Sequence, residues 1–158
     1  FNRFNNTWHH GDFAEIKKTR GFIIHGRSDT TLNPGGVRLG TAEIYSEVEK
    51  FKEIKESIVV GQSWDNDVRI ILFIVMNTNF LLTEDLLKRI KIQIRKNASP
   101  RHVPNKVIVV KDIPRTKSGK IVELAVKNII EGNNIKNKEA LANPKALEQF
   151  KNLKELRS

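Results

Sequence analysis

The apolar run from Ile70 to Met76 constrains the fold of this 158-residue chain more than any other segment. Apolar side chains at consecutive positions indicate a strand that is covered on both faces, whereas an alternating pattern would indicate one solvated face. The run is far shorter than the roughly 20 residues that a membrane-spanning helix needs. We therefore expect a long buried strand at Val68–Met76, in a small sheet with helices packed against it.

Three helices are expected from the spacing of apolar residues and from terminal signals. Gly40 is the expected N-cap of the first helix and Thr83 that of the second. The third is expected from Ile121 to Ile130, where Gly132 closes it. The side chains expected to face the core are Ile44, Val48 and Phe51 in the first helix and Leu86, Leu87, Ile90 and Ile94 in the second.

Shorter apolar stretches indicate the remaining elements. A β-hairpin is expected within residues 7–26, with a polar loop at residues 17–21. Further strands are expected at Ile58–Val60 and Lys106–Val110, and Asn143 before a proline indicates the start of a short helix. The order β, β, loop, α, β, β, α, β, α predicts a small α+β domain preceded by the end of another unit.

The composition excludes several kinds of site without naming a partner. The chain has no Cys, which excludes a disulfide, a Cys-ligated zinc and a thiol nucleophile and favours a reducing compartment. Its four His have no metal-ligand spacing, so we expect no metal site here. A net charge of +10 permits nucleic acid, a membrane surface or phosphorylated metabolites, or only a solvated surface rich in Lys and Asn. Because the basic residues are spread out and few aromatic residues accompany them, nucleic acid is not the expected partner.

The segment from Pro114 to Lys120 is the most suggestive of chemistry. It places three cations and two hydroxyl groups within seven residues, with Gly119 for flexibility, between a strand and a helix. A mobile lysine there could reach a phosphoryl or carboxylate oxygen as a point charge. The segment is not a P-loop, because Pro114 and Ile121 stand where a glycine and a Ser or Thr are required. The alternative is an exposed basic turn without a chemical role.

Two other clusters combine glycine with polar side chains. An Asp beside a glycine turn, as at Asp12, can bind the paired hydroxyls of a ribose, and Arg27 could assist it. The alternative is ordinary turn chemistry, which also favours Asp and Gly. The adjacent Gly35 and Gly36 would let the backbone approach a ligand closely, or would simply form a hairpin turn.

Together these clusters resemble the last conserved blocks of the adenylate-forming acyl-CoA synthetase and ligase superfamily. The matching blocks are residues 10–12, 26–44 and 114–120. A narrower resemblance, to the acetoacetate branch of that superfamily, rests on residues 29–38, 99–104, 118–123 and 137–144. Many members carry a basic pair after the Ser-Gly-Lys of the last block. Here Val122 and Glu123 stand in its place, which fits the acetoacetate branch.

The resemblance implies a piece of a longer protein, as does a chain that begins at Phe1 and has Met76 as its only Met. Residues 1–28 would end a large N-terminal adenylation domain, residues 29–131 would form a mobile C-terminal lid domain, and residues 132–158 would be a C-terminal extension. The N-terminal domain would be the main partner of this chain and would hold most of the ATP and acyl sites.

The resemblance also implies a reaction. Acetoacetate would be activated with ATP as an acyl-adenylate and transferred to CoA, giving acetoacetyl-CoA, AMP and pyrophosphate. Mg²⁺ is expected with ATP but not as a ligand of these residues. The implied location is cytoplasmic, without a membrane or nucleic acid as partner. The implied site residues are the catalytic Lys120, the nucleotide-binding Asp12, Arg27 and Arg38, the hinge Asp29, and the CoA-binding Gly36 and Lys91, with Lys88 and Arg95 on the same helix face as Lys91.

A hypothesis from another class is a free-standing basic α+β module that binds nucleic acid or an acidic partner. It would explain the positive charge and the absence of a large domain before these residues. It would not explain why the adenylation blocks occur in order along the chain.

Overall fold

The computed structural model describes Thr7 and residues 11–27, 30–135 and 138–158. Its centre is a mixed three-stranded sheet in the order β3 (Ile54–Trp64), β4 (Asp67–Met76) and β5 (Lys106–Val109). β4 is antiparallel to β3 and parallel to β5. Asp65 and Asn66 connect β3 to β4 with φ angles of 49° and 59°, which a two-residue hairpin turn favours. The strand expected at Ile58–Val60 is therefore longer than its short apolar core indicated.

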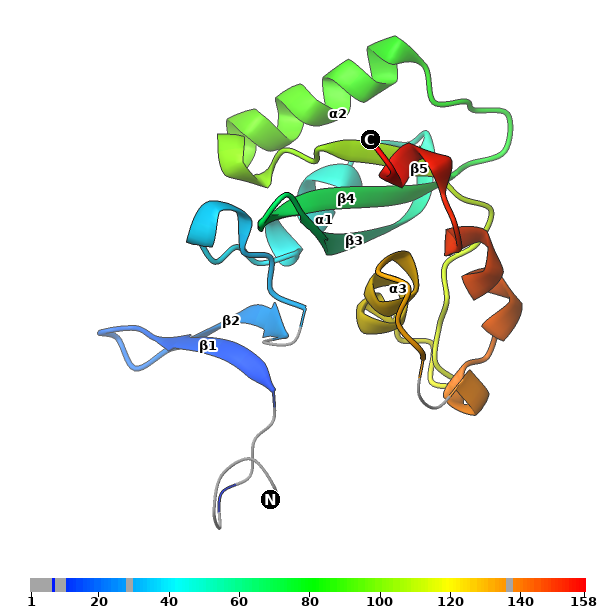
Figure 1. The fold of residues 1–158 in the computed structure, drawn as a ribbon. Helices are drawn as coiled ribbons and strands as arrows, with labels where there is room; N and C mark the ends of the chain where they lie inside the picture. The colour runs from blue at the N-terminus through cyan, green and yellow to red at the C-terminus, as the bar shows by residue number, and fades with distance from the viewer. Residues whose placement is uncertain (1–6, 8–10, 28–29, 136–137) are drawn as a thin grey trace.

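The prediction that the central strand is covered on both faces is confirmed. Ile70, Leu72 and Ile74 of β4 belong to one buried cluster, which includes side chains of α1 (Ala42–Val48) and α2 (Glu84–Asn97). The alternate residues of β4 belong to a second cluster with Val126 of α3 (Glu123–Ile130). Figure 1 shows α2 and α3 on opposite sides of the sheet. The molecule is the expected small α+β domain.

The helix termini agree with the sequence in part. The Thr83 hydroxyl accepts a hydrogen bond from the Leu86 amide at 3.2 Å, so the predicted cap of α2 is confirmed. The predicted cap of α1 is wrong: Thr41 is its N-cap, because residues 39 and 32 still pair as a β-bridge just before it. α3 begins at Glu123 rather than Ile121, since Ile121 pairs with Arg115 across the preceding loop. The described part of the chain contains no helix long and apolar enough to cross a membrane.

The predicted core faces of the helices hold with two exceptions. Leu86, Ile90 and Ile94 of α2 are buried, but Leu87 is only half-buried and lines a groove on the outer side of the helix. Phe51 packs against the core from the turn after α1, because that helix ends at Val48. Both differences come from boundaries and neighbours that helical spacing alone does not reveal.

The expected hairpin is present as β1 (Asp12–Ile16) and β2 (Phe22–Arg27), which form a two-stranded sheet of their own. Ile16 stands opposite Phe22 in the register. Ile16 and Phe22 are each 69% exposed and Ile24 is 58% exposed, so the hairpin carries uncovered apolar side chains. Figure 1 shows it apart from the three-stranded sheet.

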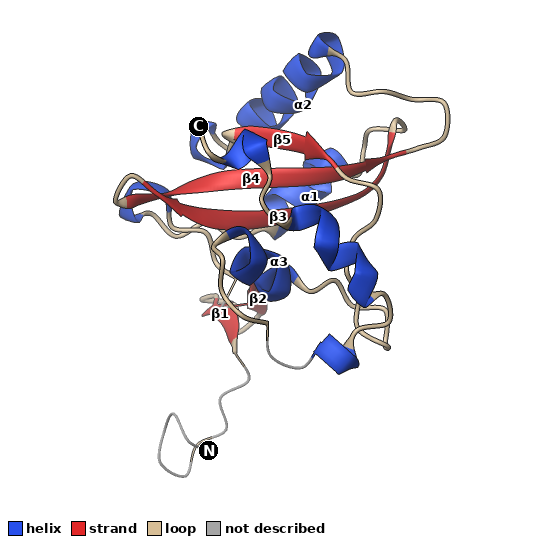
Figure 2. Cartoon of the chain, turned by 45° about the vertical axis from the view of Figure 1, so that its right-hand side comes forward, coloured by secondary structure: helices blue, strands red, loops and turns tan. Residues whose placement is uncertain are grey.

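The chain after α3 returns along the second face of the sheet (Figure 2). The short helix expected after Asn143 is a 3-10 segment, Pro144–Phe150, and Asn143 does not cap it with its side chain. Phe150 is fully buried and meets the ring of Phe73 edge-on, with the ring centres 4.9 Å apart. The guanidinium of Arg69 donates to the carbonyl oxygens of Leu156 and Ser158 at 2.6 and 2.7 Å, which holds the end of the chain against the sheet.

Candidate functional site

The segment that ends in Lys120 is an ordered turn rather than a loose basic loop. The Gly119 amide donates to the Thr116 carbonyl and the Thr116 amide to the Lys120 carbonyl, both at 2.9 Å. The Lys120 amide donates to the Thr116 hydroxyl at 3.1 Å. Gly119 has a φ of 81°, a left-handed conformation that glycine adopts without strain. The lysine turn, residues 116–120, therefore has a defined backbone.

The cations of this segment differ in their surroundings. Lys117 and Lys120 are exposed, and among the described residues the Lys120 ammonium has no hydrogen-bond or ion-pair partner. Arg115 instead turns back onto the protein. Its guanidinium lies 2.9 Å from Glu56 of β3 and donates to the Gly119 carbonyl at 3.0 Å. The sequence pattern did not distinguish Arg115 from the two lysines, whereas the structure makes it an anchor of the turn.

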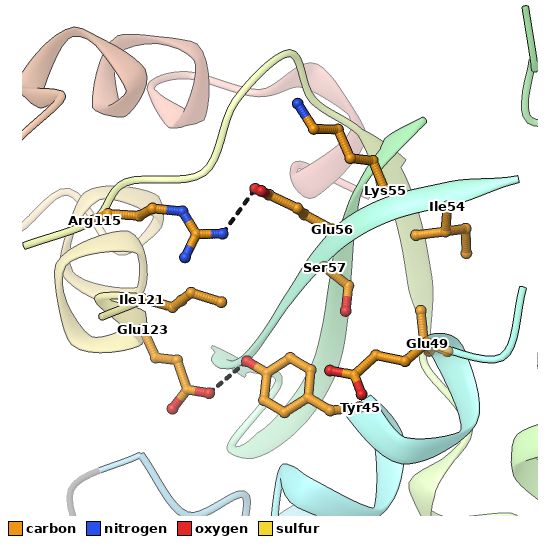
Figure 3. Close-up of a pocket in the computed structure, with 10 residues that line it drawn as sticks. Tyr45, Glu49, Ile54, Lys55, Glu56, Ser57, Arg115, Ile121 and Glu123 are labelled. Atoms are coloured by element: carbon orange, nitrogen blue, oxygen red, sulfur yellow. Dashed lines mark hydrogen bonds and ion pairs between the residues drawn. The ribbon is translucent and has the colours of Figure 1, made fainter. Parts of the chain in front are cut away.

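A cavity of about 290 Å³ lies between β3, the end of α1 and the two flanks of the lysine turn (Figure 3). Two polar pairs cross it, Arg115 with Glu56 and Tyr45 with Glu123. It is lined by Tyr45, Val48, Glu49, Ile54, Lys55, Glu56, Ser57, Arg115, Ile121 and Glu123.

Tyr45 ties the chain that follows the lysine turn to the sheet. Its hydroxyl donates a short hydrogen bond to the Glu123 carboxylate and accepts one from the Val59 amide at 3.0 Å. Burial, and then the negative charge of Glu123, raise the pKa of Tyr45 well above its usual value. Glu123 is the first residue of α3 and lies three residues after Lys120. Its carboxylate has a partner inside this domain.

Tyr45 gives a direct test of this arrangement, because it is the only Tyr of the chain. We expect no phenolate absorbance from the folded 158-residue chain near pH 10, and normal ionisation once urea unfolds it. Since the folded chain holds the proton more tightly, the resulting stabilisation is complete below about pH 10 and is lost as the pH rises through the folded-state pKa. Ionisation near pH 10 with the fold intact would contradict the half-buried Tyr45–Glu123 pair.

The paired glycines form a tight turn beside the start of β4. Gly35 and Gly36 have φ angles of 58° and 75°. The Gly35 amide donates to the Asp67 carboxylate at 2.7 Å, and backbone hydrogen bonds from Val68 and Gly35 lower the pKa of Asp67. A Cβ atom added at Gly36 would meet no atom of the described residues within 4 Å, so this side of the turn is open next to the backbone. Arg101, which sequence reasoning did not select, lies next to Gly35.

The predicted cationic face of α2 is an open groove of about 610 Å³. Lys88, Lys91 and Arg95 all line it, with Lys91 half-buried and the other two exposed. Glu84 and Asp85 line the same groove, so its charge is mixed.

The predicted nucleotide-binding residues lie in two places. Asp12 and Arg27 stand opposite each other in the hairpin register, so the fold brings these two positions together. Arg38 is exposed, six residues after Leu32 and just beyond the Gly35–Gly36 turn. Asp29, the predicted hinge, lies outside the described residues, as do His9 and His10. Within the described residues, no three His, Asp or Glu side chains gather to hold a metal ion.

Comparison with known proteins identifies the domain that carries the lysine turn. Residues 43–120 match the family described as AMP-binding enzyme C-terminal domain. Over these residues the chain therefore resembles an AMP-binding enzyme C-terminal domain. The matched segment includes the cavity walls α1 and β3 and ends at Lys120, so the lysine turn is part of the domain as the family defines it.

The similarity continues beyond this domain over the rest of the chain. The acetoacetyl-coenzyme A synthetase of Rhizobium meliloti (strain 1021) is 60% identical over 158 residues, which are 100% of this chain and 24% of the relative. The acetoacetyl-CoA synthetase of Gallus gallus is 46% identical over 160 residues, again 100% of this chain and 24% of the relative. The chain thus spans about a quarter of the length of these curated relatives.

A solved structure agrees with the sequence relatives. The acetoacetyl-CoA synthetase from Streptomyces lividans matches with a TM-score of 0.84 and 40% identity, over 96% of this chain and 23% of that one. The chain therefore shares the fold of the corresponding part of that enzyme. The hypothesis of a free-standing basic module has no support in these comparisons.

Proposed function

We propose that this chain is the C-terminal part of a ligase that joins acetoacetate to CoA at the expense of ATP. The carboxylate of acetoacetate would attack the α-phosphate of ATP, giving acetoacetyl-adenylate and pyrophosphate. The CoA thiol would then displace AMP and form the thioester. The observation that carries the proposal is the 60% identity to an acetoacetyl-coenzyme A synthetase along the whole chain.

Lys120 is the proposed catalytic residue of the first step. Its ammonium is exposed, has no partner among the described residues and follows an ordered turn. Such a charge can lie between the acyl carboxylate and an oxygen of the α-phosphate, where it would stabilise the negative charge of the transition state. Arg115 is not proposed for this role, because its guanidinium is already bound to Glu56 and Gly119.

The nucleotide would be held from the hairpin side. Asp12 could accept hydrogen bonds from the ribose hydroxyls, and Arg27 stands opposite it in the register. Arg38 is proposed to meet phosphate, and its exposed position permits this. ATP would enter as its Mg²⁺ complex, which needs no metal ligand from these residues. Asp29 is proposed as the hinge between the hairpin and the lid domain.

The second step, thioester formation with CoA, would use two other surfaces, the turn at Gly36 and the groove on α2. The open side of Gly36 would line the path of the pantetheine arm, where any side chain would narrow it. Lys91, with Lys88 and Arg95, would meet a phosphate of CoA in the groove on α2. A domain that presents the lysine turn in one step and the glycine turn in the other has to rotate between them, and the hinge supplies this motion.

The exposed apolar side of the hairpin supports the proposed division of the chain. Ile16, Phe22 and Ile24 are uncovered, although apolar side chains on a two-stranded ribbon need a packing partner to be stable. An N-terminal domain that precedes these residues would cover them, with residues 1–28 as its end, 29–131 as the lid and 132–158 as an extension. The absence of Cys favours the cytoplasm as the site of action.

A product assay on the full-length protein tests the proposal. With acetoacetate, ATP and CoA we expect equal amounts of acetoacetyl-CoA, AMP and pyrophosphate, and with ATP and acetoacetate alone only a single-turnover burst of pyrophosphate. Formation of ADP and phosphate, or no acetoacetate-dependent product, would refute it. Binding of DNA or heparin that resists physiological salt, without nucleotide binding, would favour the basic-module hypothesis instead.

A further inference from the structure

The C-terminal extension lies against the chain that leads into the lysine turn. The Asn143 amide oxygen accepts a hydrogen bond from the Arg115 backbone amide at 2.8 Å. The Asn143 amide nitrogen donates to the Asp112 carboxylate at 2.7 Å and to the Ile113 carbonyl at 2.9 Å. One side chain, 28 residues further along the chain than Arg115, thus binds three residues of the approach to the turn, Asp112, Ile113 and Arg115.

The backbone of the extension adds a second set of contacts. The Ala142 amide donates to the Arg115 carbonyl at 2.8 Å, and the Lys117 amide donates to the Ala140 carbonyl at 3.2 Å. Leu141 pairs with Thr116 as an isolated β-bridge. In both Figure 1 and Figure 2 the segment 138–150 runs beside the chain that follows β5.

Apolar packing fixes the extension in this place. Leu141 is 7% exposed and packs in one cluster with Ala125 of α3 and Leu147. Asn143 therefore sits between two anchored residues, and its side chain is held where the approach to the lysine turn passes. This explains why Asn143 does not cap the 3-10 segment that follows it.

The contacts form a continuous path from Asn143 to Lys120. Asn143 fixes the backbone of Arg115, and the Arg115 side chain binds the Gly119 carbonyl. Thr116 then bonds to the backbone of Lys120 from both its amide and its hydroxyl. A displacement of residue 115 would accordingly shift both ends of the turn that carries the lysine.

We infer that Asn143 is a positioning residue for Lys120, and that residues 140–143 brace the lysine turn during adenylation. The inference rests on the proposed role of Lys120 in that step. A displaced charge loses much of its effect on the transition state, since an error of about 1 Å can cost on the order of 10² in rate. Asn143 itself need not touch any substrate.

The test reverses donor and acceptor in the hydrogen bond between Asn143 and Asp112, in the full-length protein. N143D places a carboxylate beside Asp112 and removes both donated hydrogen bonds. In the double variant D112N/N143D, the carboxylate introduced at 143 can again accept from the amide introduced at 112. N134D is the matched control, because Asn134 is an exposed residue of the same extension. N143A removes these two bonds and also the one accepted from the Arg115 amide, without adding charge, and serves should N143D not fold.

We expect N143D to speed hydrogen exchange of the backbone amides in residues 115–120 by about tenfold, since local opening governs that exchange. We expect acetoacetate-dependent pyrophosphate release to slow by roughly 10–100-fold. The double variant should recover most of the exchange protection and most of the pyrophosphate release, and N134D should resemble the unsubstituted protein in both measurements. Thioester formation from supplied acetoacetyl-adenylate should stay nearly unchanged in all of them.

Unchanged exchange in N143D, faster exchange with an unchanged adenylation rate, or a double variant no better than N143D would each overturn the inference. A failure of the proposed function would look different: the unsubstituted full-length protein would then release no acetoacetate-dependent pyrophosphate, whatever the exchange of residues 115–120.

Discussion

Replacing Lys120 by alanine in the full-length protein is expected to slow acetoacetate-dependent pyrophosphate release by about 10²–10³-fold. The exposed ammonium would stabilise charge that develops only in the transition state of adenylation, so its removal should lower kcat more than it raises KM. The backbone of the turn does not use the lysine side chain, since its hydrogen bonds come from Thr116 and Gly119. The fold should therefore survive the change, and a thermal melt would check this.

Lys117→Ala is the matched control for this prediction. Lys117 is an exposed lysine of the same turn, and it is the backbone amide of Lys117 that donates a hydrogen bond, to the Ala140 carbonyl. We expect nearly normal pyrophosphate release from K117A. Equal losses in K117A and K120A would show that the general positive charge of the turn, and not the position of Lys120, drives adenylation.

Gly36→Leu should have the opposite effect. We expect adenylation to survive and thioester formation to fall on the order of 10²-fold, because the side chain would enter the narrow approach of the pantetheine arm. The structure leaves room for the first carbon of the side chain, with no atom of the described residues within 4 Å of it. We therefore expect the leucine to clash with CoA and not with this part of the chain. Pyrophosphate exchange and CoA transfer, measured separately, give the comparison.

The φ of 75° at Gly36 provides the competing explanation, since a leucine there is strained by roughly 1–3 kcal/mol whatever it contacts. Gly132→Leu controls for this strain, because Gly132 has a φ of 74° and equally open surroundings after α3. Gly36→Asn tolerates the same φ better but still adds bulk. Loss of CoA transfer in both Gly36 variants, with G132L active, would support the explanation that a side chain blocks the path of the pantetheine arm. Recovery of CoA transfer in G36N would favour the explanation that leucine strains the turn.

Local signals were sufficient where one residue type determines the structure. Consecutive apolar residues in β4 predicted a strand covered on both faces, and Thr83 predicted the start of α2. The crowding of cations and hydroxyls singled out residues 114–120, whereas Lys120 itself came from the family resemblance and stays a prediction. In each case the information lies within a few residues of the feature, which is why a sequence pattern can carry it.

The supports of the lysine turn could not be predicted in this way. Arg115 forms an ion pair with Glu56, and Tyr45 and Asn143 form hydrogen bonds with Glu123 and Arg115, respectively. The partners are 28 to 78 residues apart in the sequence, so only the fold brings them together. Asn143 before a proline indicated a helix cap, but its side chain instead forms hydrogen bonds with residues 112–115 and does not cap the following segment. One sequence signal was available: the family resemblance leads us to expect a basic pair at positions 122 and 123, where this chain has Val122 and the acidic Glu123.

The most direct test of the account bypasses adenylation. The full-length protein and its K120A variant would be supplied with synthetic acetoacetyl-adenylate and CoA, and acetoacetyl-CoA formation would be followed in a single turnover. We expect nearly equal rates of thioester formation for the two proteins, although their pyrophosphate release should differ by about 10²–10³-fold. A thioester step as slow in K120A as its adenylation would contradict this expectation, because Lys120 would then support the structure of the site and not the chemistry of one step.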